Sequence, residues 1–296
     1  MRKQLNIGLR QARRLCQMPH DERLAFLSEG LPIILTSAQD FWQASCQLKD
    51  RLREAEVLKG FAEEEAAKIL ILMDAVRCPM PLINSRIGKI TGWFYDHLAR
   101  LIYTETVRWR QMDVSELREF IEKERESHYL EGFCGEFVVP NWNIYQRESR
   151  LYADIATYGD GKFQWNRPNL LQELLSASYS PSVPPVLELA EAMSALGIFT
   201  HRGLKATSEI WAQITFTTTE TSVDAGRLTR QLLKRLCEDD LPSPKATQEH
   251  ARVLLSNWQI PMYDLDLRPI NVPLEKLRKE QEQMLWEEVG DAFVDY

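Results

Sequence analysis

Residues 58–76 read LKGFAEEEAAKILILMDAV, and this stretch decides the fold class. Its apolar residues return at three- and four-residue steps, as Phe61, Ile69 and Val76 show, which is the period of an amphipathic helix. The alanines between them allow a second helix to approach closely. Pro79 ends the helix, because proline lacks the backbone N–H that would continue the helical hydrogen bonds.

Helical periodicity extends on both sides of this stretch. A helix is predicted from about residue 28. Its apolar face would consist of Ile33, Ile34, Ser37, Phe41, Ala44 and Leu48. The short link to the next helix predicts that the two lie antiparallel. Downstream, one helix is predicted from Asn84 to Arg110 and another from Asp113, an N-capping residue, to Tyr129. Residues 28–130 therefore predict an up-and-down four-helix unit.

The character of the sequence changes at Gly132. Residues 133–142 predict a loop, and residues 150–165 predict a β-hairpin around Gly159-Asp160-Gly161, the only clear strand signal, although residues 151–154 could also form a helical turn. Further helices are predicted at 185–196, 203–216, 224–237, 245–257 and 273–290, with Gly197 as a stop. The predicted fold is mostly α, with a helical bundle over 20–130, an aromatic connector with a β-hairpin over 131–170 and a C-terminal helical region over 171–296.

Composition excludes several classes of protein. The 296 residues are 44% hydrophobic and 27% charged, which is typical of a globular chain. No apolar run approaches the ~20 residues of a membrane-spanning helix, and no secretory leader is recognisable, so we expect a cytoplasmic protein without membrane contact. The five cysteines form no CxxC pair and no histidines have metal-ligand spacing, so we expect no metal, no cofactor and no disulfide framework.

One segment departs from the acidic character of the chain. The net charge is -7, yet Arg77 to Arg110 contains six Lys or Arg residues and two acids, an excess of four positive charges. On one continuous helix Arg86, His97 and Arg100 would share a face. The segment predicts a local anion site, with solvated cations on an amphipathic helix as the alternative.

The helix predicted over residues 58–76 supplies negative charges. Glu64 lies four residues before Lys68, the favourable order for a helical ion pair, and an exposed pair of this kind is one interpretation. Glu63, Glu64 and Glu65 interrupt the apolar stripe, however, so at least one of them must lie at its edge. A charge there needs a partner, because an unpaired buried charge is costly. The basic helix is the candidate partner.

Two motifs in these helices resemble the AbiV-type branch of the HEPN superfamily, a group of abortive infection proteins. Phe61-Ala62-Glu63-Glu64-Glu65-Ala66-Ala67-Lys68 is similar to an A-x-E-E-x-x-K helix, and Phe94-Tyr95-Asp96-His97-Leu98-Ala99-Arg100 to an aromatic-x-x-His-x-x-basic helix. The resemblance spans residues 28–110. It implies a HEPN-like antiparallel helical bundle that forms a homodimer. It also implies a metal-independent ribonuclease of phage defence or a toxin–antitoxin system, with RNA as substrate and an antitoxin or regulatory protein as a further partner.

The residue types suit that reaction. RNA supplies its own nucleophile, the 2′-hydroxyl, whose proton a neutral imidazole can accept, while a guanidinium neutralises charge on the phosphoryl oxygens. We expect His97 in the first role, Arg86 or Arg100 in the second, and Glu64 or Glu65 as the group that orients the imidazole. The expected RNA-binding residues are Lys68, Lys89 and Arg77.

The chain departs from the superfamily in one respect. The usual Arg-x4–6-His signature is absent, since ten residues separate Arg86 from His97. The alternative is therefore a non-catalytic HEPN-like module that binds RNA, a nucleotide or a partner protein; a purely structural subunit is a third option. The aromatic residues of 133–165 predict a small core between helical layers, with base stacking as the alternative.

Overall fold

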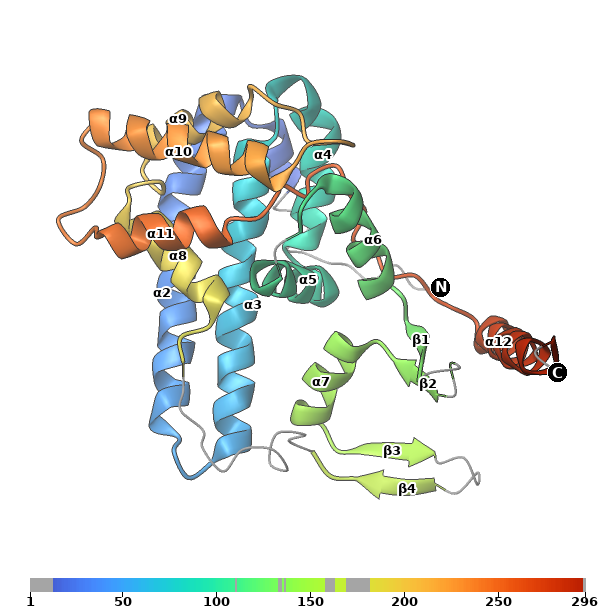
Figure 1. Cartoon of the computed structure of the whole chain (residues 1–296). Helices are drawn as coiled ribbons and strands as arrows, with labels where there is room; N and C mark the ends of the chain where they lie inside the picture. The colour runs from blue at the N-terminus through green and yellow to red at the C-terminus, as the bar shows by residue number, and fades with distance from the viewer. Residues whose placement is uncertain are drawn as a thin grey trace.

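The computed structural model describes residues 13–109, 111–132, 135, 137–157, 163–168 and 182–294. Most of these residues are helical, as predicted. Two long helices, α2 (His20–Gln47) and α3 (Leu52–Arg77), run antiparallel through the molecule and are joined by a short link (Figure 1). Many of the other helices lie around the upper half of this pair, whereas the C-terminal helix lies apart from it (Figure 1).

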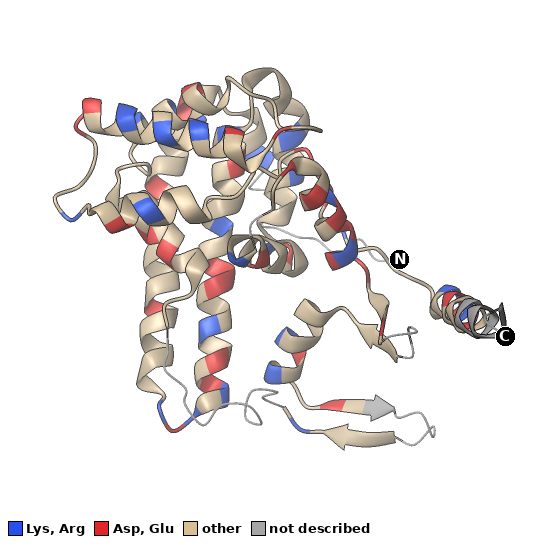
Figure 2. Cartoon of the chain, viewed as in Figure 1, with Lys and Arg blue, Asp and Glu red and all other residues tan. Residues whose placement is uncertain are grey.

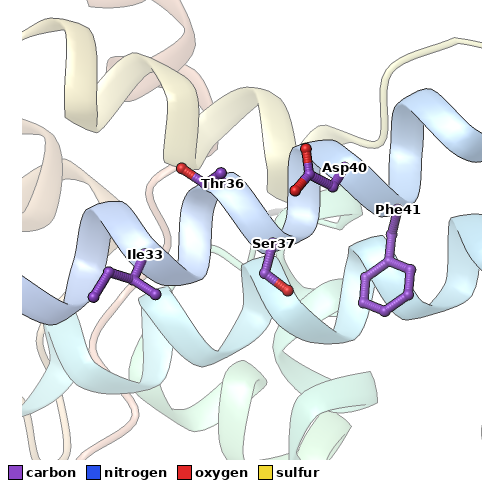
Figure 3. A pocket seen from close by; sticks show the side chains of 5 residues that line it. All are labelled: Ile33, Thr36, Ser37, Asp40 and Phe41. Atoms are coloured by element: carbon purple, nitrogen blue, oxygen red, sulfur yellow. The ribbon is translucent and has the colours of Figure 1, made fainter.

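The buried face of α2 differs from the predicted one. Leu24, Leu27, Leu31 and Leu35 are buried, whereas Ile33 is 70% exposed. The segment from Leu31 to Leu35 is apolar at every position, so periodicity alone could not select the inward face. The exposed side of this helix carries a depression. Figure 3 shows its lining residues, Ile33, Thr36, Ser37, Asp40 and Phe41.

The predicted single helix over residues 84–110 is wrong, because the chain forms α4 (Met80–Trp93) and α5 (His97–Arg108) instead. Asp96 starts α5 as its N-cap, accepting a hydrogen bond from the Ala99 amide at 2.8 Å. Arg100 Nη2 donates to the Phe94 carbonyl at 2.7 Å and thereby satisfies a backbone group that the break exposes. The break means that Arg86 and His97 do not share a face of one helix.

The segment after α5 contains strands that the sequence analysis did not find. Helix α6 (Val114–Glu124) ends earlier than predicted, and β1 (His128–Glu131) pairs antiparallel with β2 (Phe137–Pro140) in the register Tyr129↔Val139. Residues 133–142 were predicted as a loop, and that prediction is wrong for β2. A four-residue strand paired with an equally short partner carries too little periodicity to be distinguished from a helix end.

A short helix precedes the predicted hairpin. Helix α7 (Trp142–Leu151) is capped by Asn141, whose side chain accepts a hydrogen bond from the Ile144 amide at 3.1 Å. Strands β3 (Asp154–Thr157) and β4 (Phe163–Asn166) then pair antiparallel with Ile155 opposite Trp165. This confirms the hairpin, although the predicted Gly159-Asp160-Gly161 turn lies outside the described residues.

The five predicted C-terminal helices are present, with their ends shifted by a few residues. They are α8 (Pro185–Ala195), α9 (His201–Trp211), α10 (Ser222–Glu238), α11 (Gln248–Asn257) and α12 (Leu274–Val294). Gly197 follows α8 with a φ of 80°. A Cβ at this position would lie 2.2 Å from the Leu241 carbonyl oxygen, so glycine is required at this helix end.

One hydrophobic core extends from Leu15 to Leu267 and contains residues of both the N-terminal and the C-terminal helices. This shared core marks no boundary between the two parts, so the division predicted at residues 130 and 170 stays a prediction. A buried polar cluster joins the two parts, since Asp74 of α3 accepts hydrogen bonds from the Tyr103 hydroxyl and the Met262 amide, both at 2.7 Å. Burial and the neighbouring Asp74 raise the pKa of Tyr103, so this hydroxyl keeps its proton.

Candidate functional site

The acid predicted at the edge of the buried stripe is Glu64. It lies on α3, is 5% exposed, and faces α5 and α7. The alanines at positions 62, 66 and 67 are fully buried around it, so α3 approaches its neighbours closely at this level. A carboxylate in such a place requires charged partners.

His97 is the first of these partners. It is the first residue of α5, and its Nδ1 lies 2.6 Å from Glu64 Oε2. A carboxylate in this position fixes the tautomer of the neutral ring with the proton on Nδ1, which leaves Nε2 as the acceptor. The side chain is 50% exposed, and Nε2 has no hydrogen-bond partner among the described residues. The helix break therefore presents an oriented imidazole at the surface.

Two arginines complete the environment of Glu64. Arg147 Nε of α7 donates to Glu64 Oε1 at 2.7 Å, and Arg100 Nη1 of α5 lies 3.3 Å from Oε2. Burial alone would raise the pKa of Glu64, but the hydrogen bonds from Arg147 and His97 outweigh burial and lower this pKa below its ordinary value. Glu64 is thus an ionised carboxylate shared by three cationic or protonatable groups.

Beside this cluster is a polar cleft of about 260 Å³ between α3, α5 and α7. Four acids and four bases line it: Glu56, Glu63, Glu64, Glu105, Lys59, Arg108, Arg147 and Arg150. Most of these charges are paired across the helices, with Arg108 2.6 Å from Glu63 and Arg150 3.7 Å from Glu56. Burial nevertheless raises the pKa of Glu63, because the Arg108 charge only partly offsets it.

The predicted RNA-binding residues do not gather at this cluster. Arg77 is 1% exposed and its guanidinium lies against the rings of Trp211 and Trp258, so the side chain belongs to the core and its RNA binding stays a prediction. Lys89 of α4 donates to the Leu265 carbonyl at 2.6 Å. Lys68 lies nearer the cluster, on α3, where it pairs with Glu65.

Arg86, predicted as a catalytic residue, is also held elsewhere. Its Nε donates to Asp264 Oδ1 at 2.9 Å, because α4 packs against the segment that precedes α12. The excess of positive charge seen in the sequence is therefore compensated by distant acids and carbonyl groups. Figure 2 shows acidic and basic residues interspersed over the helices around the site. The local anion site predicted for this segment stays a prediction, and Arg110 lies outside the described residues.

Arg147 is the site residue that the sequence analysis missed. It lies between the loop predicted over residues 133–142 and the hairpin predicted over residues 150–165, and its partner is 83 positions away. The available signal was Asn141, an N-capping residue before a stretch with an apolar Ile144 and Leu151 on one face. That signal predicts a short helix, but not its contact with Glu64.

No three His, Cys, Asp or Glu side chains in the described ranges are grouped so that they could hold a metal ion. Over the same ranges, every helix is too short or too polar to cross a lipid bilayer. Comparisons with family models, with curated proteins and with solved structures gave no match to this chain.

Proposed function

We propose that the chain is an AbiV-like HEPN protein that cleaves RNA as a metal-independent endoribonuclease. One observation carries the proposal. Glu64 of the first motif and His97 of the second are 33 positions apart in the sequence, yet Glu64 contacts His97 at 2.6 Å and Arg100 at 3.3 Å. A carboxylate that orients a half-exposed imidazole is the arrangement that acid–base catalysis needs.

The reaction uses the nucleophile of the substrate itself. His97 Nε2 accepts the proton of the 2′-hydroxyl, the 2′-oxygen forms a bond to the adjacent phosphorus, and the bond from phosphorus to the 5′-oxygen breaks. A proton delivered to that oxygen gives a 5′-hydroxyl end, and the other product ends in a 2′,3′-cyclic phosphate. Glu64 stabilises the imidazolium that forms between the two proton transfers.

The structure favours a different guanidinium from the predicted ones for the phosphoryl group. Arg100 uses Nε and Nη2 on the Phe94 carbonyl and Nη1 on Glu64, so it acts as a positioning residue. Arg147 uses Nε and Nη1, and its Nη2 has no partner in the described part of the chain. Because Arg147 and His97 contact the same carboxylate, one phosphate group can bridge them.

The test is cleavage of single-stranded RNA in the presence of a chelator. We expect His97→Gln to lower the rate by about 10²–10⁴-fold, the usual contribution of a general acid–base group. His128→Gln is the matched control, since this half-buried histidine lies in β1, away from Glu64. Unaltered cleavage by His97→Gln, or no cleavage by the folded wild-type chain, would overturn the proposal.

A non-catalytic module is the second candidate, and one observation favours it. Arg86, Lys89 and Arg108 are each bound by an acid or a carbonyl group, which leaves little uncompensated positive charge for a polyanion. This candidate predicts nucleotide or protein binding without turnover. A homodimer, and an antitoxin or regulatory protein as a partner, are predictions in both cases.

A further inference from the structure

The surface of α7, β3 and β4, called the arm here, comprises residues 142–157 and 163–168. Exposed apolar side chains are concentrated on it. They are Trp142, Tyr145, Tyr152, Ile155, Phe163 and Trp165, exposed by 39–76%. The prediction of a small aromatic core in this region is therefore wrong, because these side chains face outward. Large exposed aromatic residues in one patch are typical of protein interfaces.

The β3–β4 hairpin presents one aromatic face. The register places Ile155 opposite Trp165, and Phe163 lies two residues from Trp165 on the same strand, so the three side chains share a face. Phe163 and Trp165 are 76% and 75% exposed. An isolated two-stranded hairpin is marginally stable in water, so a face of this kind gains stability when another surface covers it.

A groove lies next to these projecting residues. It is a concavity of about 780 Å³ between α7 and the hairpin, and Tyr145, Tyr152 and Ile155 form its apolar lining. The arm thus combines a groove with two projecting aromatic side chains. A surface with both features can pair with its own copy across a two-fold axis, because each contact is then made twice.

The opposite side of α7 contacts the helical bundle. Arg147 and Arg150 point to Glu64 and Glu56 of α3, and Asn143 donates to Glu124 Oε2 at 2.6 Å. No residue of α7 is fully buried, and Ile144 packs partly buried against the core, so these polar contacts supply much of the attachment of the helix to the bundle. The aromatic side is the one that remains available.

We propose that the arm docks on the arm of a second copy of this chain, with Phe163 and Trp165 of each copy in the groove of the other. The carboxylates of Glu148 and Asp154 also line the groove, and they can accept the indole N–H of the inserted tryptophan. This inference rests on the arm alone and does not depend on the proposed ribonuclease activity.

The exposed aromatic area supplies much of what such a dimer needs. An aromatic side chain buries about 150–250 Å² when it is fully covered, so the five exposed aromatic residues present roughly 450–700 Å². Ile155 and the polar rim of the groove add to this. A stable interface of ordinary size covers ~800 Å² on each partner.

The charges of the groove favour a protein occupant over RNA. Its charged lining in the described residues consists of Glu148, Asp154 and Arg167, which gives one more acid than base. This surface offers no excess of positive charge to a phosphate backbone, whereas the uncharged rings of a second copy need none. Base stacking on the arm is therefore the outcome that the experiment must exclude.

The experiment compares sedimentation velocity of the full chain and its variants across the micromolar range. We expect a dimer for wild type and a monomer for the double variant Phe163→Ser/Trp165→Ser. Trp286→Ser is the matched control, because Trp286 on α12 is also 75% exposed but lies outside the arm, and it should remain dimeric. Far-UV circular dichroism checks that each variant folds.

A mixing experiment tests the geometry. Tyr152→Asp should close the groove to an aromatic ring and give a monomer. A mixture of Tyr152→Asp with the double variant restores one of the two insertions, so it should associate more weakly than wild type while each component alone stays monomeric. A monomeric wild-type chain, arm variants that behave like Trp286→Ser, or a labelled single-stranded RNA that binds through Trp165 without dimerisation would each overturn the proposal.

Discussion

The buried Arg77 allows the sharpest test of the fold. Its guanidinium is paired with Asp74, donates to the Gln259 carbonyl at 2.8 Å, and lies 4.6 Å from the ring centres of both Trp211 and Trp258. Arg77→Met would leave the Asp74 carboxylate buried with two neutral donors and no countercharge. Breaking a buried ion pair in this way costs about 3–5 kcal/mol, so we expect a loss of that size in the free energy of unfolding.

The assay is urea denaturation followed by far-UV circular dichroism. Arg252→Met is the matched control, because Arg252 is ion-paired with Glu249 at the surface and should cost less than about 1 kcal/mol. Asp74→Asn removes the charge that Arg77 compensates, so adding Arg77→Met to it should cost less than in wild type, with a coupling of about 0.5–3 kcal/mol. If Arg77→Met were as mild as the control and instead weakened RNA binding, Arg77 would be a binding residue and the argument from burial would be refuted.

Three further changes test single contacts. Gly197→Ala should lower stability by about 1–3 kcal/mol, because its φ is 80° and a Cβ would meet the Leu241 carbonyl; an unchanged thermal midpoint would contradict this. Burial and the nearby Arg23 lower the pKa of His20, so the folded state binds its proton less readily than the unfolded state. Stability should therefore be retained above the ordinary pKa of 6.5 and lost as pH falls toward the lowered value, and a His20→Gln variant with the same pH profile as wild type would refute the assignment. Arg147→Ala removes a hydrogen bond that lowers the pKa of Glu64, so a carboxyl NMR titration should show that pKa rise; if it stays in place, Arg147 is not the group responsible.

Local patterns predicted the part of the site that lies within helices. The acid of α3 had to lie near the buried stripe, and Glu64 does so. The neighbouring basic segment supplied His97 and Arg100, although residues 84–110 were predicted as one helix without a break between Trp93 and His97. That break depends on the Asp96 cap and on the contact of Arg100 with the Phe94 carbonyl, and the second of these forms only in the folded chain.

Such local patterns could not predict contacts between segments that are distant in sequence. The pairing of Arg147 with Glu64, and of Arg86 with Asp264, joins positions 83 and 178 residues apart. Each of these residues is an ordinary surface charge when its own segment is considered alone. The β1 strand was missed for the same reason, because its partner across the ladder, and not its four residues, determines its conformation.

The partners of Glu64 lie on two helices that differ in how firmly they are packed into the fold. His97 and Arg100 belong to a helix anchored by fully buried side chains such as Ile102 and Tyr103, whereas Arg147 belongs to a helix without a buried residue. Backbone amides of α7 should exchange with deuterium sooner than those of α5, and added salt should widen the difference by screening the ion pairs. Local opening of one short helix would then release a guanidinium from the carboxylate while the imidazole stays in place.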